Sequence, residues 1–384
     1  MTRLAEQPQA EPPKPIGSTN WRAEVERRQE EVLPSGQVVV SCSAPPGSGG
    51  LGRHVQEILD AFDRRGQRAV CICGRDPSSA APTRYRRTMR RAINSTLALP
   101  PVRLAAAQRA LRYCREFDSY AAGQLSAVDH LIAFNGSALA QIRAARGTVG
   151  ASTALVSATS HFRLLLRQHE RAHAQYPLEE SWARRLLGRN LSEYAEADRI
   201  YVASEYVRGS FIDQGFREDM LAMLPLTPDP RFELERASPR SSTFDIVFVG
   251  SLSVVKGVPL LIDAVRALPH ADMRLVLVGG WKSRGMRRFV ERACAEDPRI
   301  TSSHGDPLPR LRGARLYVHP SYNDGFAYAP AEALACGVPA IVSEDTGMKE
   351  LIDPGRTGLV VPTGDLSALT EAVDAAYRGE LFNG

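Results

Sequence analysis

The chain has 384 residues, which suits two domains of ordinary size better than one small core. With 43% hydrophobic and 24% charged residues and no long apolar run, its composition excludes a membrane-spanning protein and a disordered chain. A net charge of +5 is too small to indicate nucleic-acid binding, and the six scattered cysteines have neither metal-ligand spacing nor CxxC pairs.

The first 35 residues are polar and rich in proline, and they contain no apolar segment of the kind that a secretory signal needs. We expect residues 1–35 to be a disordered leader. Because the cysteines look like reduced packing residues, we also expect the protein to be cytoplasmic.

A glycine-rich loop follows the first predicted strand, residues 37–42. Its sequence GSGGLG, with Gly47, Gly49 and Gly52, matches the G-x-G-x-x-G pattern of dinucleotide-binding proteins. That pattern alone indicates a dehydrogenase, but the acid expected after the second strand is offered only by Asp76. Glycines before a helix equally allow the backbone to approach any phosphate, so both interpretations stay open.

Nine arginines and no acid lie between residues 81 and 115. One interpretation is a solvated basic helical face. The other is contact, through the Arg84–Arg115 region, with an anionic membrane or a phosphorylated acceptor, so that the protein is peripheral at the inner membrane face. The arginines are Arg84, Arg86, Arg87, Arg90, Arg91, Arg103, Arg109, Arg112 and Arg115.

Short apolar runs alternate with helical stretches through the first half, which predicts an α/β domain with a parallel sheet. Near residue 225 the sequence becomes rich in proline, serine and charge, which indicates a linker. We therefore predict two Rossmann-like doubly wound domains joined by a linker, with a cleft between the domains. The predicted limits are residues 36–225, 226–243 and 244–384.

One helical segment contains H-E-x-x-H, formed by His169, Glu170 and His173. Zinc peptidases place two imidazoles and a base in this spacing. The pattern is short, its helix is rich in arginine and no third ligand is specified, so a surface helix with two histidines is the preferred interpretation. We expect no metal.

The second half opens with a buried strand, residues 245–249, and a loop that carries Lys256 and Gly257. The chain has only four lysines, and this one emerges at the carboxyl end of a strand. It is either an ordinary loop lysine or a point charge for a diphosphate.

Residues 321–362 contain two carboxylates eight positions apart, Asp324 and Glu332, on either side of a predicted helix start. Gly325 precedes that helix, and Gly337 follows it. Free N–H groups at such a helix start can hold an anion, while Glu332 points to the same place from further along.

The segments VGSLSVVKGV, LVLVGG and PSYNDGFAYAPAEALACGVPAIVSEDTGMKELI resemble, in order and spacing, the C-terminal domain of retaining GT-B glycosyltransferases of family 4. The resemblance covers residues 246–362. GGLGRHV, and FNGSAL followed by VSATSH, extend it more weakly into the first half, and the chain is also similar to the subgroup that builds cell-surface polysaccharides.

The resemblance implies that the first predicted domain is an N-terminal Rossmann-like acceptor domain and the second a C-terminal Rossmann-like nucleotide-sugar-binding domain. It also implies a role for each matching position. Glu332 binds the ribose hydroxyls, and Asp324 contacts the transferred sugar. Lys256 balances the diphosphate charge. The remaining implied positions are the backbone of Gly325, Phe326 and Ala327 at the sugar and distal phosphate, Ser251 at the diphosphate, Gly305 at the nucleobase, Gly50 and Gly52 at phosphate or acceptor, and His161 at the sugar.

Three positions depart from the family pattern. Asp324 replaces a glutamate, Ala327 replaces a common glycine, and Ser251 stands where an arginine often supplies a second diphosphate cation. We expect a substitute arginine, for which Arg284, Arg287 and Arg288 are candidates.

The resemblance implies a metal-independent transfer of a hexose-type unit from a nucleoside diphosphate sugar to a hydroxyl of a glycan, a lipid-linked acceptor or a small molecule. It implies retention of anomeric configuration and no cofactor beyond the co-substrate. Two alternatives stay open: a nucleotide-binding relative with altered or lost transfer activity, and an NAD(P)-dependent oxidoreductase.

Overall fold

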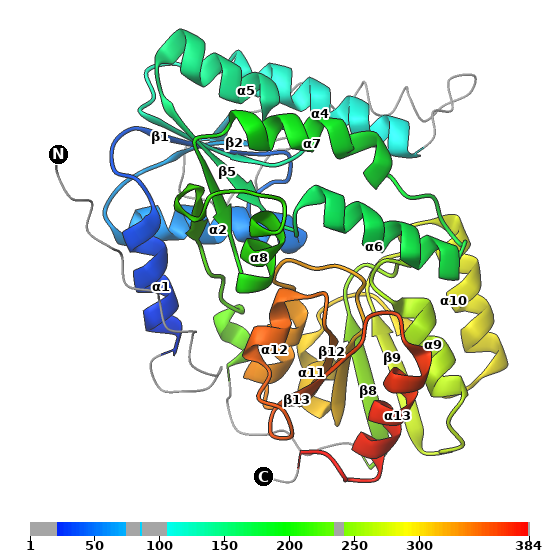
Figure 1. The fold of residues 1–384 in the computed structure, drawn as a ribbon. Helices are drawn as coiled ribbons and strands as arrows, with labels where there is room; N and C mark the ends of the chain where they lie inside the picture. Colours follow the sequence, from blue (N-terminus) through cyan, green and yellow to red (C-terminus); the bar gives the residue numbers. More distant parts are fainter. Residues whose placement is uncertain (1–20, 74–84, 87–105, 234–241, 383–384) are drawn as a thin grey trace.

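Two parallel β-sheets, each covered by helices, make up the computed structural model (Figure 1). The structure describes residues 21–73, 85–86, 106–233 and 242–382. We call the part built on the first sheet the N-terminal domain and the part built on the second sheet the C-terminal domain.

The first sheet has seven strands, and its order runs outward from β1 in both directions because successive βα units are placed on both sides of it. Apolar residues dominate these strands, as expected where both faces are buried. In order across the sheet, the strands are β3 (Tyr85–Arg86), β2 (Val70–Cys73), β1 (Val38–Cys42), β4 (His130–Phe134), β5 (Ser152–Ser157), β6 (Arg199–Val202) and β7 (Leu221–Met223).

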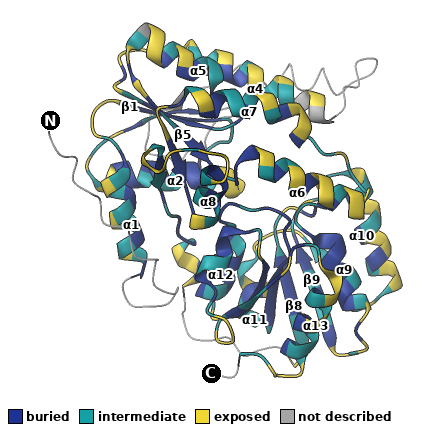
Figure 2. Cartoon of the chain, viewed as in Figure 1, coloured by how far each residue is buried: buried dark blue, intermediate teal, exposed yellow. Residues whose placement is uncertain are grey.

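Helices cover both faces of this sheet, with buried faces inward and exposed faces outward (Figures 1 and 2). Alternate strand residues serve the two faces: Leu131 packs under the α4, α5 and α7 layer, and Ile132 packs against α2. The helices are α2 (Gly49–Arg64), α4 (Ala106–Ala122), α5 (Leu139–Ala144), α6 (Phe162–Gln175), α7 (Ala183–Glu196) and α8 (Glu205–Ile212).

The second sheet has six parallel strands in the same kind of order. Its strands are β10 (Ile300–Ser303), β9 (Met273–Val278), β8 (Phe244–Val249), β11 (Leu316–His319), β12 (Ala340–Ser343) and β13 (Gly358–Val361).

Phe248 of β8 packs on the side of α9, α10 and α13, and Val247 packs on the side of α11 and α12. The helices are α9 (Val258–Arg266), α10 (Arg284–Glu296), α11 (Leu308–Gly313), α12 (Tyr328–Ala335) and α13 (Leu366–Tyr377).

The expected disordered leader is wrong for residues 21–32, which form helix α1 (Trp21–Val32) beside α2. Trp21 and Val25 are buried in the core cluster that contains α12 and Phe232. Burial of this indole offsets the ordering cost of a helix whose sequence is otherwise charged. Residues 1–20 lie outside the described residues.

The two domains touch through side chains and backbone around the ends of their strands. Asn323 donates to Ser160 Oγ at 2.7 Å and to Tyr206 Oη at 2.8 Å, and Ser204 Oγ donates to the carbonyl of Gly325 at 2.7 Å. The Glu350 carboxylate accepts from the backbone N–H of Tyr206 at 2.6 Å. The predicted linker falls between β7 and β8, and its residues 234–241, like Asp76, lie outside the described residues; the exact domain limits stay a prediction.

Candidate functional site

The loop between β11 and α12 holds the first part of the site. Gly325 is pressed against the N-terminal domain, since a Cβ there would lie 2.3 Å from the carbonyl oxygen of Ala158. Ala327 caps α12 with φ 58° and ψ 93°, a backbone conformation that L side chains rarely adopt. Within the part of the chain that the structure describes, the N–H groups of Gly325, Phe326 and Ala327 donate no hydrogen bond. Together these three N–H groups can donate hydrogen bonds to an anion.

Lys256 and Asp324 meet beside this loop. The ammonium of Lys256 forms an ion pair with Asp324 Oδ2, and Nε2 of the buried His319 lies 3.1 Å from the same oxygen. Burial raises the pKa of Asp324, but the Lys256 charge and the His319 hydrogen bond outweigh it and hold that pKa well below its usual range. Asp324 is therefore ionised, and its carboxylate can only accept hydrogen bonds. Burial keeps the pKa of His319 low, so the neutral imidazole donates its Nε2–H to Asp324. Sequence reasoning missed His319 as a partner.

Glu332 lies about one turn after the start of α12, and its side chain is only 3% exposed. Its Oε1 forms an ion pair with Nη1 of Arg53 at 2.5 Å, and the Arg53 guanidinium lies 4.1 Å from the ring centroid of Tyr328. Burial raises the pKa of Glu332, and the Arg53 charge opposes that rise. Arg53 belongs to α2, so this contact joins the two domains, and sequence reasoning missed it.

The glycine-rich loop has two kinds of glycine. Gly52 is buried, and a Cβ there would lie 2.1 Å from the carbonyl oxygen of Pro45, so the turn itself requires this glycine. Gly50 is exposed, and its Cβ position faces the Tyr328 ring at 4.0 Å. The start of α2 thus lies against the start of α12.

The remaining predicted residues are not joined to these contacts. The ring of His161 is buried against Tyr194 at 5.1 Å and Phe211 at 5.0 Å between ring centroids. Its Nδ1 accepts from the backbone N–H of Arg163 and its own backbone N–H donates to Ser210, also of the N-terminal domain. Burial, with the Arg163 charge, lowers the pKa of His161 to about 4. Ser251 is exposed at the end of β8, and Gly305 is exposed with φ 117° after β10. Their roles stay predictions.

The side chain of Phe326 belongs to the core of the C-terminal domain, edge to face with Tyr328 at 5.5 Å between centroids. Any ligand contact at this position therefore comes from its backbone.

The H-E-x-x-H segment packs as an ordinary helix. His169 is buried with its ring edge to face with Trp182 at 5.2 Å, and His173 Nδ1 lies 2.6 Å from the carbonyl oxygen of His169. In the described residues no group of three His, Cys, Asp or Glu side chains could hold a metal ion.

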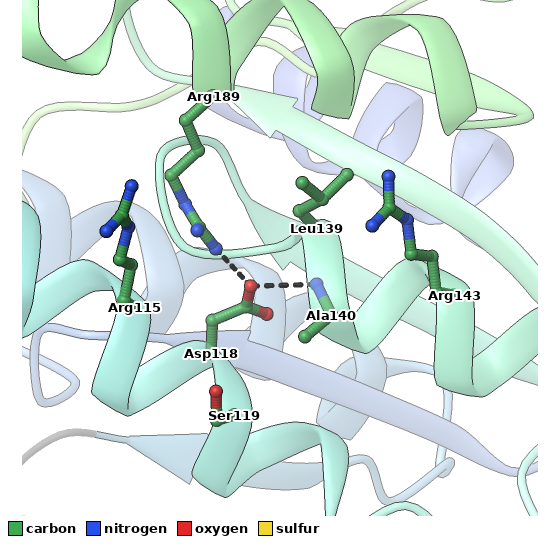
Figure 3. Close-up of a pocket in the computed structure, with 7 residues that line it drawn as sticks. All are labelled: Arg115, Asp118, Ser119, Leu139, Ala140, Arg143 and Arg189. Carbon is green, nitrogen blue, oxygen red and sulfur yellow. Dashed lines mark hydrogen bonds and ion pairs between the residues drawn. The ribbon is translucent and has the colours of Figure 1, made fainter.

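A separate depression lies on the outer side of the N-terminal domain between α4, α5 and α7 (Figure 3). At its centre Asp118 caps α5 through the N–H of Ala140 at 2.7 Å and forms an ion pair with Arg189. Arg143 is held by Glu196, with Nη2 to Oε1 at 2.6 Å. Because these arginines are already paired with carboxylates, we interpret the depression as a helix-packing ion-pair network.

The basic region is described only in part. Arg112 and Arg115 lie on α4, and Arg112 Nε donates to Glu116 at 2.8 Å. Most of the other arginines lie outside the described residues. Among the helices that the structure describes, none has the length and apolar character needed to cross a membrane.

Two family models match the chain. Residues 48–230 match Glycosyltransferase Family 4, and residues 243–378 match Glycosyl transferases group 1. Together the two matches cover most of the chain.

Curated relatives align over part of the chain. A D-inositol 3-phosphate glycosyltransferase of Pseudarthrobacter chlorophenolicus is 30% identical over 207 residues, 51% of this chain and 48% of the relative. The O-antigen chain mannosyltransferase B of Escherichia coli is 32% identical over 132 residues, 32% of this chain and 34% of the relative. The chain spans about half the length, or less, of the curated relatives it matches.

Solved structures match the whole fold at low sequence identity. Sucrose-phosphate synthase from Thermosynechococcus elongatus has a TM-score of 0.68 at 18% identity and covers 90% of each chain. Anabaena Alr3699/HepE in complex with UDP and glucose has a TM-score of 0.62 at 16% identity, over 90% of this chain and 91% of that one.

The two parallel sheets and these structural neighbours define the class: two Rossmann-like domains in the GT-B arrangement. The chain belongs to family 4 of the glycosyltransferases.

Proposed function

We propose that the protein is a retaining glycosyltransferase that moves a hexose-type unit from a nucleoside diphosphate sugar to an acceptor hydroxyl. The observation that carries the proposal is the set of unbonded N–H groups at residues 325–327 beside the Lys256 ammonium, in the described residues. The complexes of Anabaena Alr3699/HepE with UDP and with UDP-glucose, although they establish only a shared fold, favour a nucleotide-sugar donor.

Each group has a stated task in this proposal. Glu332 accepts hydrogen bonds from the ribose hydroxyls. Lys256 and His319 fix Asp324 through one oxygen, and Asp324 presents its other oxygen to a sugar hydroxyl. The N–H groups at the start of α12 hold the distal phosphate. Gly305 contacts the nucleobase, and His161, which precedes α6 in the N-terminal domain, faces the sugar.

The reaction breaks the bond between the anomeric carbon and the diphosphate oxygen and forms a bond from that carbon to the acceptor oxygen. Negative charge grows on the departing phosphate, and Lys256 with the helix-start N–H groups stabilises it; one such preorganised donor is worth about 2.7–4 kcal/mol. The acceptor's proton goes to the departing phosphate on the same face, so the configuration is retained and no side-chain base is needed.

The relatives' names differ in acceptor, so the acceptor class is kept broad: a glycan, a lipid-linked acceptor or a small molecule. The Arg84–Arg115 region is proposed as the face that attracts an anionic acceptor or membrane surface. With that contact the protein would work in the cytoplasm, at the inner membrane face.

A ligand panel tests the donor class. UDP, GDP, ADP and NAD(H) are added separately, and the unfolding temperature is followed. At least one nucleoside diphosphate should raise it and NAD(H) should not. Stabilisation by NAD(H) alone would overturn the proposal in favour of an oxidoreductase.

A second assay separates an active enzyme from a relative that binds without transfer, which the departures at Asp324 and Ala327 motivate. Nucleotide sugars are incubated with the protein, and the released nucleotide is detected by mass. Release above a no-enzyme blank is expected for at least one donor; binding without release from any of them, with candidate acceptors present, would favour the non-transferring relative.

A further inference from the structure

Arg53 has no task in the proposed function, yet it touches a central residue of the site. It lies in the first turns of α2, directly after Gly52 of the glycine-rich loop. Its Nη1 is 2.5 Å from Glu332 Oε1 across the contact between the two domains. In the described conformation Arg53 thus occupies the carboxylate that is proposed to accept ribose.

The pair is sustained by the burial of Glu332. That side chain is 3% exposed, while Arg53 is 27% exposed. A carboxylate removed from water is costly to leave unpaired, so Glu332 holds a cation until another donor takes its place. Ribose hydroxyls are such donors, and a nucleotide whose ribose takes Oε1 displaces Arg53 from that oxygen.

Arg53 is placed to find a second anion close by. Its guanidinium lies over the Tyr328 ring, and Tyr328 is the first residue of α12. The unbonded N–H groups of residues 325–327 precede that residue directly. A diphosphate joined to the displacing ribose would reach the same helix start, within the sweep of a long arginine side chain.

The departure at Ser251 also leads us to expect a further cation for the diphosphate. The ammonium of Lys256 is already paired with Asp324, and Ser251 brings no charge. Arg287 Nε is bonded to Glu291 at 2.7 Å, and Arg284 and Arg288 are exposed on α10. Arg53 differs from these candidates because it already lies against the proposed ribose residue and α12.

We propose that Arg53 is a diphosphate-binding residue supplied by the N-terminal domain, stored on Glu332 in the empty site and transferred to the donor's phosphates when ribose takes Glu332. The inference rests on the proposed function. It also explains how binding at the C-terminal domain can draw the glycine-rich loop of the other domain onto the donor.

The test compares two ligands that differ only in phosphate. Affinities for the best-binding diphosphate among UDP, GDP and ADP, and for its parent nucleoside, are measured with the wild type and with Arg53→Ala and Arg53→Lys. If Arg53 makes a charge-assisted contact with the phosphates, Arg53→Ala should weaken the affinity for the diphosphate by about tenfold or more. Nucleoside affinity should be unchanged or improved because Glu332 is vacated, and Arg53→Lys should fall between wild type and alanine.

The matched control is Arg64→Ala, which removes an arginine of the same helix whose Nε is paired with Glu30 at 2.8 Å, outside the site. It should leave both affinities at wild-type values. An equal loss of diphosphate and nucleoside affinity in Arg53→Ala, or no loss at all, overturns the inference and reduces Arg53 to a contact between domains. A wild type that binds none of the diphosphates would instead overturn the proposed function.

Discussion

At the residue scale, the charges of the candidate site are arranged as two ion pairs. Lys256 neutralises Asp324, and Arg53 neutralises Glu332. Each pair joins a residue with an exposed part to a more buried carboxylate, so the cation opposes the effect of burial on the carboxyl pKa and fixes the direction of the carboxylate. A donor that brings hydroxyls and a diphosphate can therefore bind by exchange of partners without leaving a buried charge alone.

Lys256 should matter most when the leaving phosphate gains charge. We expect Lys256→Ala to lower kcat for donor hydrolysis or transfer by about 10²–10³, the typical effect of removing one preorganised donor. The measurement is steady-state release of the nucleotide. Lys282→Ala, which removes an exposed lysine, is the control and should keep wild-type turnover. Near-normal turnover in Lys256→Ala would contradict the assignment.

The role of Glu332 can be tested by removing a hydroxyl from the ribose of the ligand. The wild type should prefer a nucleoside diphosphate over its 2′-deoxy form, and Glu332→Gln should lose about tenfold or more of that preference, since a hydrogen bond to a charged group is weakened. Calorimetric titration of both ligands measures it. Glu371→Gln on α13, where Glu371 accepts from the exposed Ser367, should keep the preference. If Glu332→Gln discriminates as well as the wild type, the ribose lies elsewhere.

At the element scale, the start of α12 stores strain. Ala327 has φ 58° with a side chain that favours negative φ. Replacement by glycine should relieve roughly 1–2 kcal/mol of steric cost and add about 0.5–1 kcal/mol of chain entropy cost. We expect Ala327→Gly to unfold at a slightly higher temperature. Ala331→Gly, inside the same helix, should do the opposite, because it loses about 1 kcal/mol of helix propensity. A lower melting temperature for Ala327→Gly would contradict the strain.

The strands that the sequence predicted, such as residues 37–42 and 245–249, are short runs of mostly apolar residues. Two edge strands were missed: β10 is Ile300–Ser303, with one apolar residue, and β7 has three residues. A strand at an edge is paired on one side only, so its sequence needs less apolar character. Helix α1 was missed because its charged residues hide the two apolar side chains that anchor it.

The site divides in the same way. The loop and helix that carry Asp324 and Glu332 could be predicted, since their glycines, proline and carboxylates lie close together in the sequence. His319 and Arg53 could not, because their contacts depend on how β11 meets its loop and how two domains dock. The basic residue directly after the glycine loop was the available signal for Arg53.

At the scale of the whole molecule, several buried histidines make stability depend on pH. Burial lowers the pKa of His54 to about 3, of His161 to about 4 and of His169 to about 3. Their pKa values in the unfolded chain lie near 6.5. Between about pH 6.5 and pH 4 the unfolded chain therefore binds protons that the folded protein does not, and stability falls as the pH falls.

A buried acid opposes this trend, and the opposition sets how the test must be designed. Burial raises the pKa of Glu193 to about 7, so below that pH the folded protein binds a proton that the unfolded chain lacks until about pH 4.5. Between pH 6 and pH 5 these three histidines, less Glu193, should contribute about two protons to the slope, roughly 1.4 kcal/mol per pH unit for each. Urea unfolding at several pH values measures it. His54→Leu should lower the slope by about one proton. The control is His130→Leu, at a partly exposed histidine, which should leave most of the slope. An unchanged slope in His54→Leu would show that His54 takes up its proton in the folded state.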